Sequence, residues 1–307
     1  TDNALYRFNH WLKSSLKKTL WPGSTLFEDM GFTYLGPIDG HDLPRLCDVL
    51  QWAKELRCPV VVHVNTIKGK GYSFAEKDPG KFHGIGPFDP VTGIVRTQGG
   101  ENFSAVFGKT LSACAAEDGR VCAITAAMAD GTGLSGFARE FPERFFDVAI
   151  AEGHGVSMAA GLAAQGMIPV FGVYSTFLQR TCDQLIHDAA IEPKHIVLAI
   201  DRAGIVGADG ETHQGLFDVS MLRMVPGTVI YSPATYRQLE ADLAEAVDNG
   251  TGICAVRYPK GAQPALTASV LGENTDSWFL ENWGGDTLLV TYGRLAEELF
   301  LARKSLE

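Results

Sequence analysis

The sequence predicts an α/β protein with a mostly parallel sheet and helices on both faces. Apolar runs typical of strands alternate with helical stretches from Asn102 to Pro264. This alternation is typical of a parallel sheet whose two faces are covered by the intervening helices. The segment from Phe145 to Arg180 shows it most clearly, because it contains a strand, a helix, a second strand and a second helix in direct succession.

Each element of that segment has its own signal. Phe146–Ala151 and Met167–Tyr174 are short apolar runs, as expected of strands buried on both faces of a sheet. Gly153–Ala164 is rich in glycine and alanine, which predicts a helix packed closely against the sheet. Ser175 or Thr176 is expected to cap the helix that follows.

The rest of this domain continues the alternation to Pro264. In chain order, we expect a helix at 103–116, a strand at 121–126, a helix at 135–140, a strand at 195–201, a helical stretch at 216–223, a strand at 228–233, a helix at 235–248 and a strand at 252–259. A loop at 126–133 and a longer loop at 201–215 follow two of these strands.

The N-terminal third contains too few elements to close a two-faced layer by itself. We expect a helical arm at 1–27, a strand at 28–36, a helix at 43–55 capped by the turn at 39–42, and a strand at 60–66. Residues 73–101 are rich in proline and glycine and predict a linker. The expected divisions are an incomplete domain at 1–72, the linker, a domain at 102–264, and a linker with the start of another domain at 265–307.

Composition excludes several classes of protein. The net charge of −10 argues against a nucleic-acid partner. No apolar run approaches the roughly 20 residues that span a bilayer, and the N-terminal residues lack a signal-peptide pattern. The six cysteines are scattered and contain no CxxC pair, and most of them lie in apolar segments, which predicts reduced core residues of a cytoplasmic protein.

Glu152 is the unusual residue of the central segment, because it stands where an apolar strand ends and a glycine-rich helix begins. In open α/β sheets, ligands bind in the crevice at that edge. A carboxylate there is expected to have a raised pKa unless a partner holds its charge. The alternative is an acidic residue that simply favours the helix N-terminus, and the segment alone leaves both interpretations open.

Three loops are further candidates for chemistry. The loop at 201–215 places Arg202, Asp209 and His213 among glycines, where an arginine can grip a phosphate and the other two can orient hydroxyls or move protons. The glycine-rich basic loop at 66–71 can approach a phosphate. His83 in the linker is either solvated or closes over a site, and a mobile surface loop remains the alternative for 201–215.

These segments resemble a known family. AEGHGVSMAAGLA, VYSTFLQR, AIDRAGIVGADGETHQG and VRYPKG are similar to the pyrimidine-binding domain of the 1-deoxy-D-xylulose-5-phosphate synthase family, in the transketolase superfamily. FTYLGPIDGHD, TIKGKGYSFAEKDPGKFHG and FDP resemble the end of that family's first, diphosphate-type domain and its linker. The resemblance implies thiamine diphosphate and Mg²⁺ as cofactors, and a homodimer.

The resemblance also implies roles for individual residues. It implies that pyruvate is decarboxylated and condensed with D-glyceraldehyde 3-phosphate to give 1-deoxy-D-xylulose 5-phosphate. The residues with an implied catalytic role are Glu152, His83 and His213. Those implied to bind the cofactor are Tyr72, Lys68, Glu152, Phe177, Ile150, Met128 and Arg180, and those implied to bind substrate are Tyr174, Arg202, Asp209, His213 and Lys260.

The sequence departs from the family pattern in three ways. The GDG…N motif that holds Mg²⁺ and the diphosphate is absent from these residues, so we expect an internal fragment of a longer enzyme with little activity alone. Gly153 stands where the family usually has glutamine, and Lys260 replaces an arginine, which turns a planar two-pronged clamp into a point charge. The alternatives are a half-subunit of another thiamine-diphosphate enzyme, or a non-catalytic module that keeps the fold.

Overall fold

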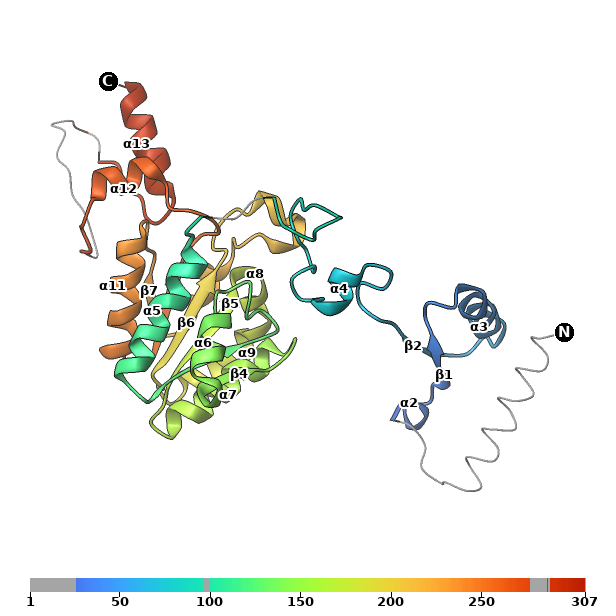
Figure 1. Ribbon diagram of the computed structural model, residues 1–307. Helices are drawn as coiled ribbons and strands as arrows, with labels where there is room; N and C mark the ends of the chain where they lie inside the picture. The colour runs from blue at the N-terminus through green and yellow to red at the C-terminus, as the bar shows by residue number, and fades with distance from the viewer. Residues whose placement is uncertain (1–25, 97–99, 277–285, 287, 307) are drawn as a thin grey trace. The chain divides into compact units, whose positions relative to one another are not determined.

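The computed structural model describes residues 26–96, 100–276, 286 and 288–306 (Figure 1). The chain forms two compact units, Thr1–Gln98 and Gly99–Glu307. The expected helical arm at 1–27 lies almost wholly outside the described residues.

The first unit contains a small two-stranded sheet. Its elements are α2 (Leu26–Asp29), β1 (Thr33–Asp39), α3 (Leu43–Glu55), β2 (Val60–Asn65) and α4 (Ser73–Lys77). The two strands pair in parallel, and Leu35, Ile38 and Val49 form the buried centre. Asp42 caps α3 as expected, because its side chain accepts a hydrogen bond from the Arg45 backbone N–H at 3.1 Å.

The predicted strand at 28–36 is wrong at its N-terminal end. Leu26–Asp29 is a helical turn, and the Phe32 N–H closes it by donating to the Phe27 carbonyl at 2.9 Å. Gly31 adopts φ +87°, a left-handed conformation that glycine tolerates and that ends the turn. The strand therefore starts only at Thr33 and continues to Asp39.

The second unit confirms the predicted fold class. Its strands are β3 (Val121–Thr125), β4 (Phe145–Asp147), β5 (Ile168–Tyr174), β6 (Ile196–Asp201), β7 (Val229–Tyr231) and β8 (Ile253–Arg257). They form one sheet in the order β4-β3-β5-β6-β8-β7, and every neighbouring pair is parallel. The helices are α5 (Phe103–Glu117), α6 (Ser135–Glu140), α7 (Glu152–Ala164), α8 (Ser175–Leu178), α9 (Cys182–Gln184), α10 (Asp218–Leu222), α11 (Tyr236–Asp248), α12 (Ala265–Leu271) and α13 (Leu295–Leu306).

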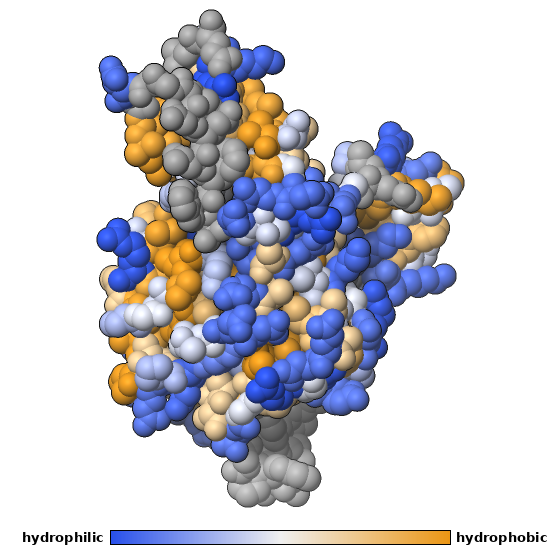
Figure 2. Space-filling view, turned by 90° about the vertical axis from the view of Figure 1, so that its left-hand side faces the viewer, coloured by the Kyte–Doolittle hydropathy of each residue, from blue (hydrophilic) through white to orange (hydrophobic). Residues whose placement is uncertain are grey.

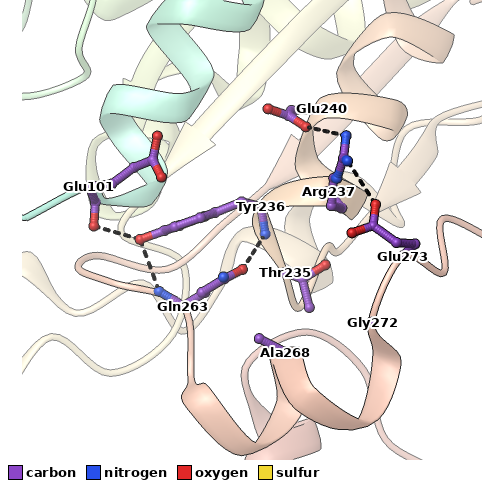
Figure 3. A pocket seen from close by; sticks show the side chains of 9 residues that line it. All are labelled: Glu101, Thr235, Tyr236, Arg237, Glu240, Gln263, Ala268, Gly272 and Glu273. Atoms are coloured by element: carbon purple, nitrogen blue, oxygen red, sulfur yellow. Dashed lines mark hydrogen bonds and ion pairs between the residues drawn. The ribbon is translucent and has the colours of Figure 1, made fainter.

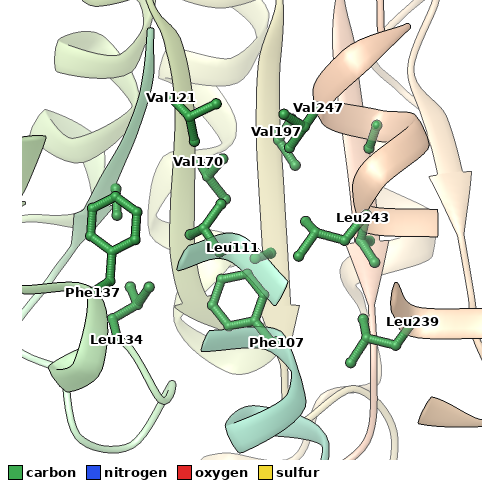
Figure 4. Packing of buried hydrophobic residues seen from close by; sticks show 14 of the residues in the cluster. Phe107, Leu111, Val121, Leu134, Phe137, Val170, Val197, Leu239, Leu243 and Val247 are labelled. Atoms are coloured by element: carbon green, nitrogen blue, oxygen red, sulfur yellow. The ribbon is translucent and has the colours of Figure 1, made fainter. Parts of the chain in front are cut away.

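Helices cover both faces of this sheet. Successive strand residues point to opposite sides, so each strand contributes side chains to both helical layers. On one face, Val121, Val170 and Val197 pack against α5, α6 and α11 (Figure 4). On the other face, Phe171 and Leu198 pack against residues of α7, α8 and α10. The continuous apolar runs seen in the sequence are therefore strands buried on both sides.

The cysteines only partly match the expectation of core residues. All six are free, as expected. Cys122 and Cys254 are buried, but Cys47 and Cys58 are exposed. They lie in the first unit, whose two-stranded sheet offers little buried volume.

The predicted strand at 146–151 is also wrong in extent. β4 is a three-residue edge strand that ends at Asp147. The Asp147 carboxylate accepts hydrogen bonds from the backbone N–H groups of Ala127 (2.8 Å) and Ala149 (2.9 Å), which turns the chain away from the sheet. Ala149 takes φ +56°, and Ile150 beyond it is 75% exposed. A local side-chain hydrogen bond has overridden the apolar pattern.

Neither Ser175 nor Thr176 caps α8 as predicted. Ser175 is itself the first helical residue, with its hydroxyl buried and without a hydrogen-bond partner among the described residues. Thr176 instead donates to the Thr212 carbonyl at 3.0 Å, which ties α8 to the loop at 201–215. After α8 the chain continues through a 3-10 turn, α9 and a π-helical stretch at 185–190, so the expected single helix is irregular.

A small separate core lies where α12 meets α13. It contains Ala234, Leu271, Ala296 and Phe300. Among the described residues after 286, exposed apolar side chains include Leu288, Val290, Leu295 and Leu301. Figure 2 shows hydrophobic surface at the upper end of the molecule in that view. None of the helices among the described residues is long and apolar enough to cross a membrane.

Candidate functional site

The parallel sheet gathers the candidate residues of the second unit at its carboxyl edge. β3, β5, β6 and β8 end side by side at Thr125, Tyr174, Asp201 and Arg257. The segments that follow these strands carry Met128, Phe177, Arg202, Asp209, His213 and Lys260, with Phe177 in the short helix α8. Residues that lie up to about 130 positions apart in sequence therefore converge at one edge, where open α/β sheets bind ligands.

Glu152 is a buried carboxylate at the first position of α7, only 4% exposed. Arg180 reaches it from the turn after α8, and its Nη1 lies 3.0 Å and 3.2 Å from the two carboxylate oxygens. The arginine side chain is 53% exposed, so one member of the ion pair faces solvent. Glu152 therefore has an ion-pair partner from a neighbouring turn, and both interpretations that the sequence left open remain compatible with this contact.

An aromatic group lies directly beside this ion pair. The Phe177 ring is partly buried, stacks on Tyr174 at a centroid separation of 5.9 Å and meets the His213 ring edge-on at 5.4 Å. The Arg180 guanidinium also lies over the Phe177 ring, 5.3 Å from its centre. A flat apolar surface and a buried carboxylate are thus bridged by one arginine.

Arg202 occupies a highly constrained position at the end of β6. Its backbone is left-handed, with φ +59°, a strained conformation for a residue with a side chain. Its guanidinium lies 3.7 Å from the centre of the Tyr174 ring, and its Nη1 donates to the Gly131 carbonyl at 3.0 Å. Its Nε donates to Asp209 at 3.0 Å. Contacts from the loop after β3, from the end of β5 and from its own loop therefore fix this side chain.

Asp209 joins two cations. It accepts hydrogen bonds from Arg202 and from Lys260, which approaches its other oxygen. Burial by itself would raise the pKa of the Asp209 carboxyl, but the hydrogen bonds from Lys260 and Arg202 outweigh it and hold the pKa below its usual value. Burial raises the pKa of the neighbouring Tyr174 hydroxyl despite the nearby Arg202 charge.

The loop at 201–215 is ordered by its own hydrogen bonds. Gly204 and Gly215 pair in an antiparallel bridge. Gln214 spans the loop: its side-chain oxygen accepts from the Val206 N–H at 2.8 Å, and its amide donates to the carbonyls of Val206 and Gly210. His213 contacts the Thr212 hydroxyl through Nδ1 at 2.9 Å. The alternative of a mobile surface loop is therefore disfavoured.

Met128 and Ile150 lie in different environments. Met128, in the loop after β3, is 9% exposed and packs in the core cluster that includes Val156 and Leu178. Ile150 is largely exposed two residues before α7.

Lys68, Tyr72 and His83 belong to the first unit. Tyr72 donates its hydroxyl hydrogen to the Pro90 carbonyl at 2.9 Å. Its ring lies 5.6 Å and 5.8 Å from the centres of Phe82 and Phe88. Lys68 and His83 are exposed in turns on either side of α4.

The sequence did not single out three residues that shape this site. Gly131 supplies a carbonyl to Arg202, and a Cβ added to Gly131 would stand 1.7 Å from the Tyr174 hydroxyl oxygen. Asp201 and Ser104 form a partly buried hydrogen bond beside Arg202. The usable signal for Gly131 was its place in a loop after a strand end, and for Asp201 the charged residue that closes an otherwise apolar strand.

The departure at Gly153 has a structural counterpart. A Cβ at this position would lie 3.0 Å from the side-chain oxygen of Gln184, which comes from α9. Gln184 thus fills the space beside residue 153, and its oxygen has no hydrogen-bond partner among the described residues. A larger residue at 153 would require Gln184 to move.

Two cavities lie in the second unit, and the second of them is partly lined by Ala203, Gly204 and Gly215 of the loop at 201–215. One of about 390 Å³ lies where α11 begins, and Tyr236 there donates to the Glu101 carbonyl and accepts from the Gln263 N–H (Figure 3). Another of about 500 Å³ lies beside the buried pair Arg257–Asp218. Within the described part of the chain, no group of three or more histidine, cysteine, aspartate or glutamate residues could hold a metal ion.

Comparisons with known proteins agree with this architecture. Residues 101–264 match the family model described as transketolase, pyrimidine binding domain, and residues 1–66 match the model described as 1-deoxy-D-xylulose-5-phosphate synthase. The 1-deoxy-D-xylulose-5-phosphate synthase of Clostridium kluyveri is 48% identical over 96% of this chain and 47% of its own length. That of Desulforudis audaxviator is 54% identical over 86% of this chain and 43% of its own length.

Among solved structures, a split-gene transketolase described as an inactive β4 tetramer is 28% identical, with a TM-score of 0.48, over 54% of each chain. The chain spans about half the length of the curated relatives that it matches. The chain therefore belongs to the 1-deoxy-D-xylulose-5-phosphate synthase family, and its residues 101–264 are a transketolase-type pyrimidine-binding domain.

Proposed function

We propose that this chain contributes the pyrimidine-binding part of an enzyme that condenses pyruvate with D-glyceraldehyde 3-phosphate. The products are 1-deoxy-D-xylulose 5-phosphate and CO₂. The enzyme is then a transferase of isoprenoid, thiamine and pyridoxal biosynthesis, and we place it in the cytoplasm. The observation that carries the proposal is the placement of Glu152, Phe177 and the cations Arg202 and Lys260 at one sheet edge.

The residues present fit the pyrimidine half of thiamine diphosphate. A buried carboxylate can hold a proton against a ring nitrogen, and a partly exposed aromatic face can stack on a heteroaromatic ring. Glu152 and Phe177 have these properties and are bridged by Arg180. When bound, the cofactor supplies an electron sink for decarboxylation, while the protein supplies position and charge.

The aldehyde side of the site is built for an anion. Arg202 and Lys260 lie on opposite oxygens of Asp209, so both cations are close enough to bind one phosphate group. Asp209, Tyr174 and His213 are the neighbouring groups that can hold the substrate hydroxyls. Lys260 serves as a point charge where the family usually has a planar arginine.

The first unit and a second copy complete the proposed enzyme. Lys68 and Tyr72 contact the cofactor, and His83 takes part in catalysis. Mg²⁺ and the diphosphate are bound by residues that the described part of this chain does not supply. The active form is a homodimer.

The test of this function is a Glu152→Gln substitution in a protein that spans the full length of the relatives. Removing a general acid–base group typically costs about 10²- to 10⁴-fold in rate, so we expect turnover of pyruvate with glyceraldehyde 3-phosphate to fall by that amount. The melting temperature should stay near that of the parent. An unchanged turnover rate would remove Glu152 from the mechanism.

A further inference from the structure

A buried carboxylate lies directly behind Arg202. Asp201 is the last residue of β6 and is completely buried. Its Oδ2 accepts a hydrogen bond from the Ser104 hydroxyl at 2.6 Å, and its Oδ1 lies 3.3 Å from Nη1 of Arg202. Ser104 belongs to the first turn of α5. The carboxylate therefore links the Arg202 guanidinium to α5, whose Ser104 is 97 positions away from Asp201 in the sequence.

This contact completes the set that orients Arg202. Its Nε donates to Asp209, and its Nη1 donates to the Gly131 carbonyl. Nη1 also forms an ion pair with Asp201, and the guanidinium lies over the Tyr174 ring. Among the described residues, none accepts a hydrogen bond from Nη2. The side chain is 12% exposed, and Nη2 is the guanidinium nitrogen whose hydrogen-bonding capacity these contacts leave for a ligand.

Asp201 is an unfavourable residue for fold stability at this position. Burial raises its pKa to about 6, against the opposing effects of the Arg202 charge and the Ser104 hydrogen bond. Its Oδ1 and the buried Tyr258 hydroxyl both lack a hydrogen-bond partner among the described residues. A buried ion pair of this kind contributes little net stability, because desolvation offsets the attraction. What the carboxylate does supply is a fixed direction for the guanidinium.

We propose that Asp201, anchored by Ser104, is a positioning residue that orients Arg202 to bind the phosphate group of the acceptor aldehyde. The identity of that acceptor rests on the proposed function, whereas the anion site itself rests on the contacts of Arg202. Asp201 does not touch the substrate; it acts through the guanidinium.

The experiment compares Asp201→Ala with Asp201→Asn in the full-length protein. The readout is kcat/KM for D-glyceraldehyde 3-phosphate divided by kcat/KM for D-glyceraldehyde, each with pyruvate. Asparagine can still place an oxygen beside Nη1 of Arg202 and form a hydrogen bond with the Ser104 hydroxyl, whereas alanine can do neither. Loss of a hydrogen bond to a charged group corresponds to about a tenfold effect, so alanine should lower the ratio about tenfold and asparagine should retain most of it.

Asp218→Asn is the matched control. Asp218 is equally buried and is paired with another arginine, Arg257, whose side chain is also 12% exposed. This variant should lower the melting temperature without changing the ratio of the two aldehydes. Ser104→Ala is the second variant, to be used if Asp201→Ala does not fold. It removes only the hydrogen bond from Ser104 to Asp201. It should therefore lower the ratio as well, by a smaller factor.

Binding of inorganic phosphate, followed by calorimetry, separates the two proposals. The parent should bind phosphate, and Asp201→Ala should weaken that binding about tenfold. A parent that binds phosphate but turns over neither aldehyde would refute the proposed function and leave the positioning role supported. The positioning role is overturned when the parent binds no phosphate, when alanine leaves the ratio unchanged, or when asparagine falls to the level of alanine.

Discussion

At the scale of single residues, the site depends on close contacts that tolerate no additional atom. Gly131 is the clearest case, because a Cβ added to it would lie 1.7 Å from the Tyr174 hydroxyl oxygen. That ring cannot move freely, since the Arg202 guanidinium lies 3.7 Å from its centre. Any displacement of the tyrosine is therefore passed to the arginine.

We expect Gly131→Ala to lower the free energy of unfolding by about 1–3 kcal/mol, as overpacking does. It should also weaken the binding of inorganic phosphate, measured by calorimetry. Gly136→Ala is the control, because nothing lies within 4 Å of its added Cβ and alanine favours the helix α6. Equal effects of the two substitutions would contradict this account.

The ion pair between Glu152 and Arg180 gives a second prediction at this scale. Arg180→Leu leaves the buried carboxylate without its partner and should destabilise the protein by about 1–3 kcal/mol in thermal or chemical unfolding. In a Glu152→Gln background the same substitution should cost much less. A double-mutant cycle measures this difference, and additive effects would show that the pair is not coupled.

At the scale of elements, α11 carries a carboxyl group that the site does not use. Asp242 lies on this helix, and burial raises its pKa to about 7. The folded state therefore holds the proton more tightly than the unfolded chain does, whose aspartate titrates near 3.8. The associated stability is fully present below about pH 4 and is lost as the pH rises through about 7.

We therefore expect Asp242→Asn to raise the melting temperature relative to the parent at pH 8 and to leave it nearly unchanged at pH 4. Melting curves across this range, recorded by circular dichroism, provide the measurement. Asp248→Asn, at the exposed end of the same helix, should follow the parent at both pH values. A stabilisation by Asp242→Asn that is equal at pH 4 and pH 8 would contradict the assigned cause.

At the scale of the whole molecule, the second unit is held by two apolar layers, one on each face of the sheet. Phe107 of α5 is completely buried in one of them and stacks on the Tyr258 ring at 5.5 Å. We expect Phe107→Ala to lower the free energy of unfolding by about 3–5 kcal/mol, because it leaves a cavity around which the packed sheet and helices relax only partially. Chemical denaturation measures the loss, and a cost below 1 kcal/mol would contradict the packing described.

The share of the relatives' length that this chain spans leads to a prediction about activity. The chain spans about half the length of its curated relatives, and no metal-binding group occurs among its described residues. We expect the 307 residues alone to turn over pyruvate and glyceraldehyde 3-phosphate far more slowly than a protein of the relatives' full length. A side-by-side turnover assay with thiamine diphosphate and Mg²⁺ is the measurement, and equal rates would contradict this expectation.

The sequence alone determined the fold class and the succession of elements. Alternating apolar and helical stretches are a local property of the chain, and parallel strands with covered faces follow from them. One error occurred where a local hydrogen bond overrode the pattern, at Asp147, whose carboxylate ends β4 early. Another occurred at Ser175, which begins α8 with its hydroxyl buried instead of capping the helix. The resemblance of motifs, rather than physical reasoning, supplied most of the proposed residue roles.

Only the tertiary structure decided which charges meet. Arg180 is 28 positions from Glu152 and Ser104 is 97 positions from Asp201, so no sequence periodicity connects either pair. Parallel pairing of β5 and β6 brings Tyr174 beside Asp201, and the left-handed backbone at Arg202 then turns its side chain back over that ring. These contacts arise from the order of strands in the sheet, which depends on packing between distant segments and is not written in any one of them.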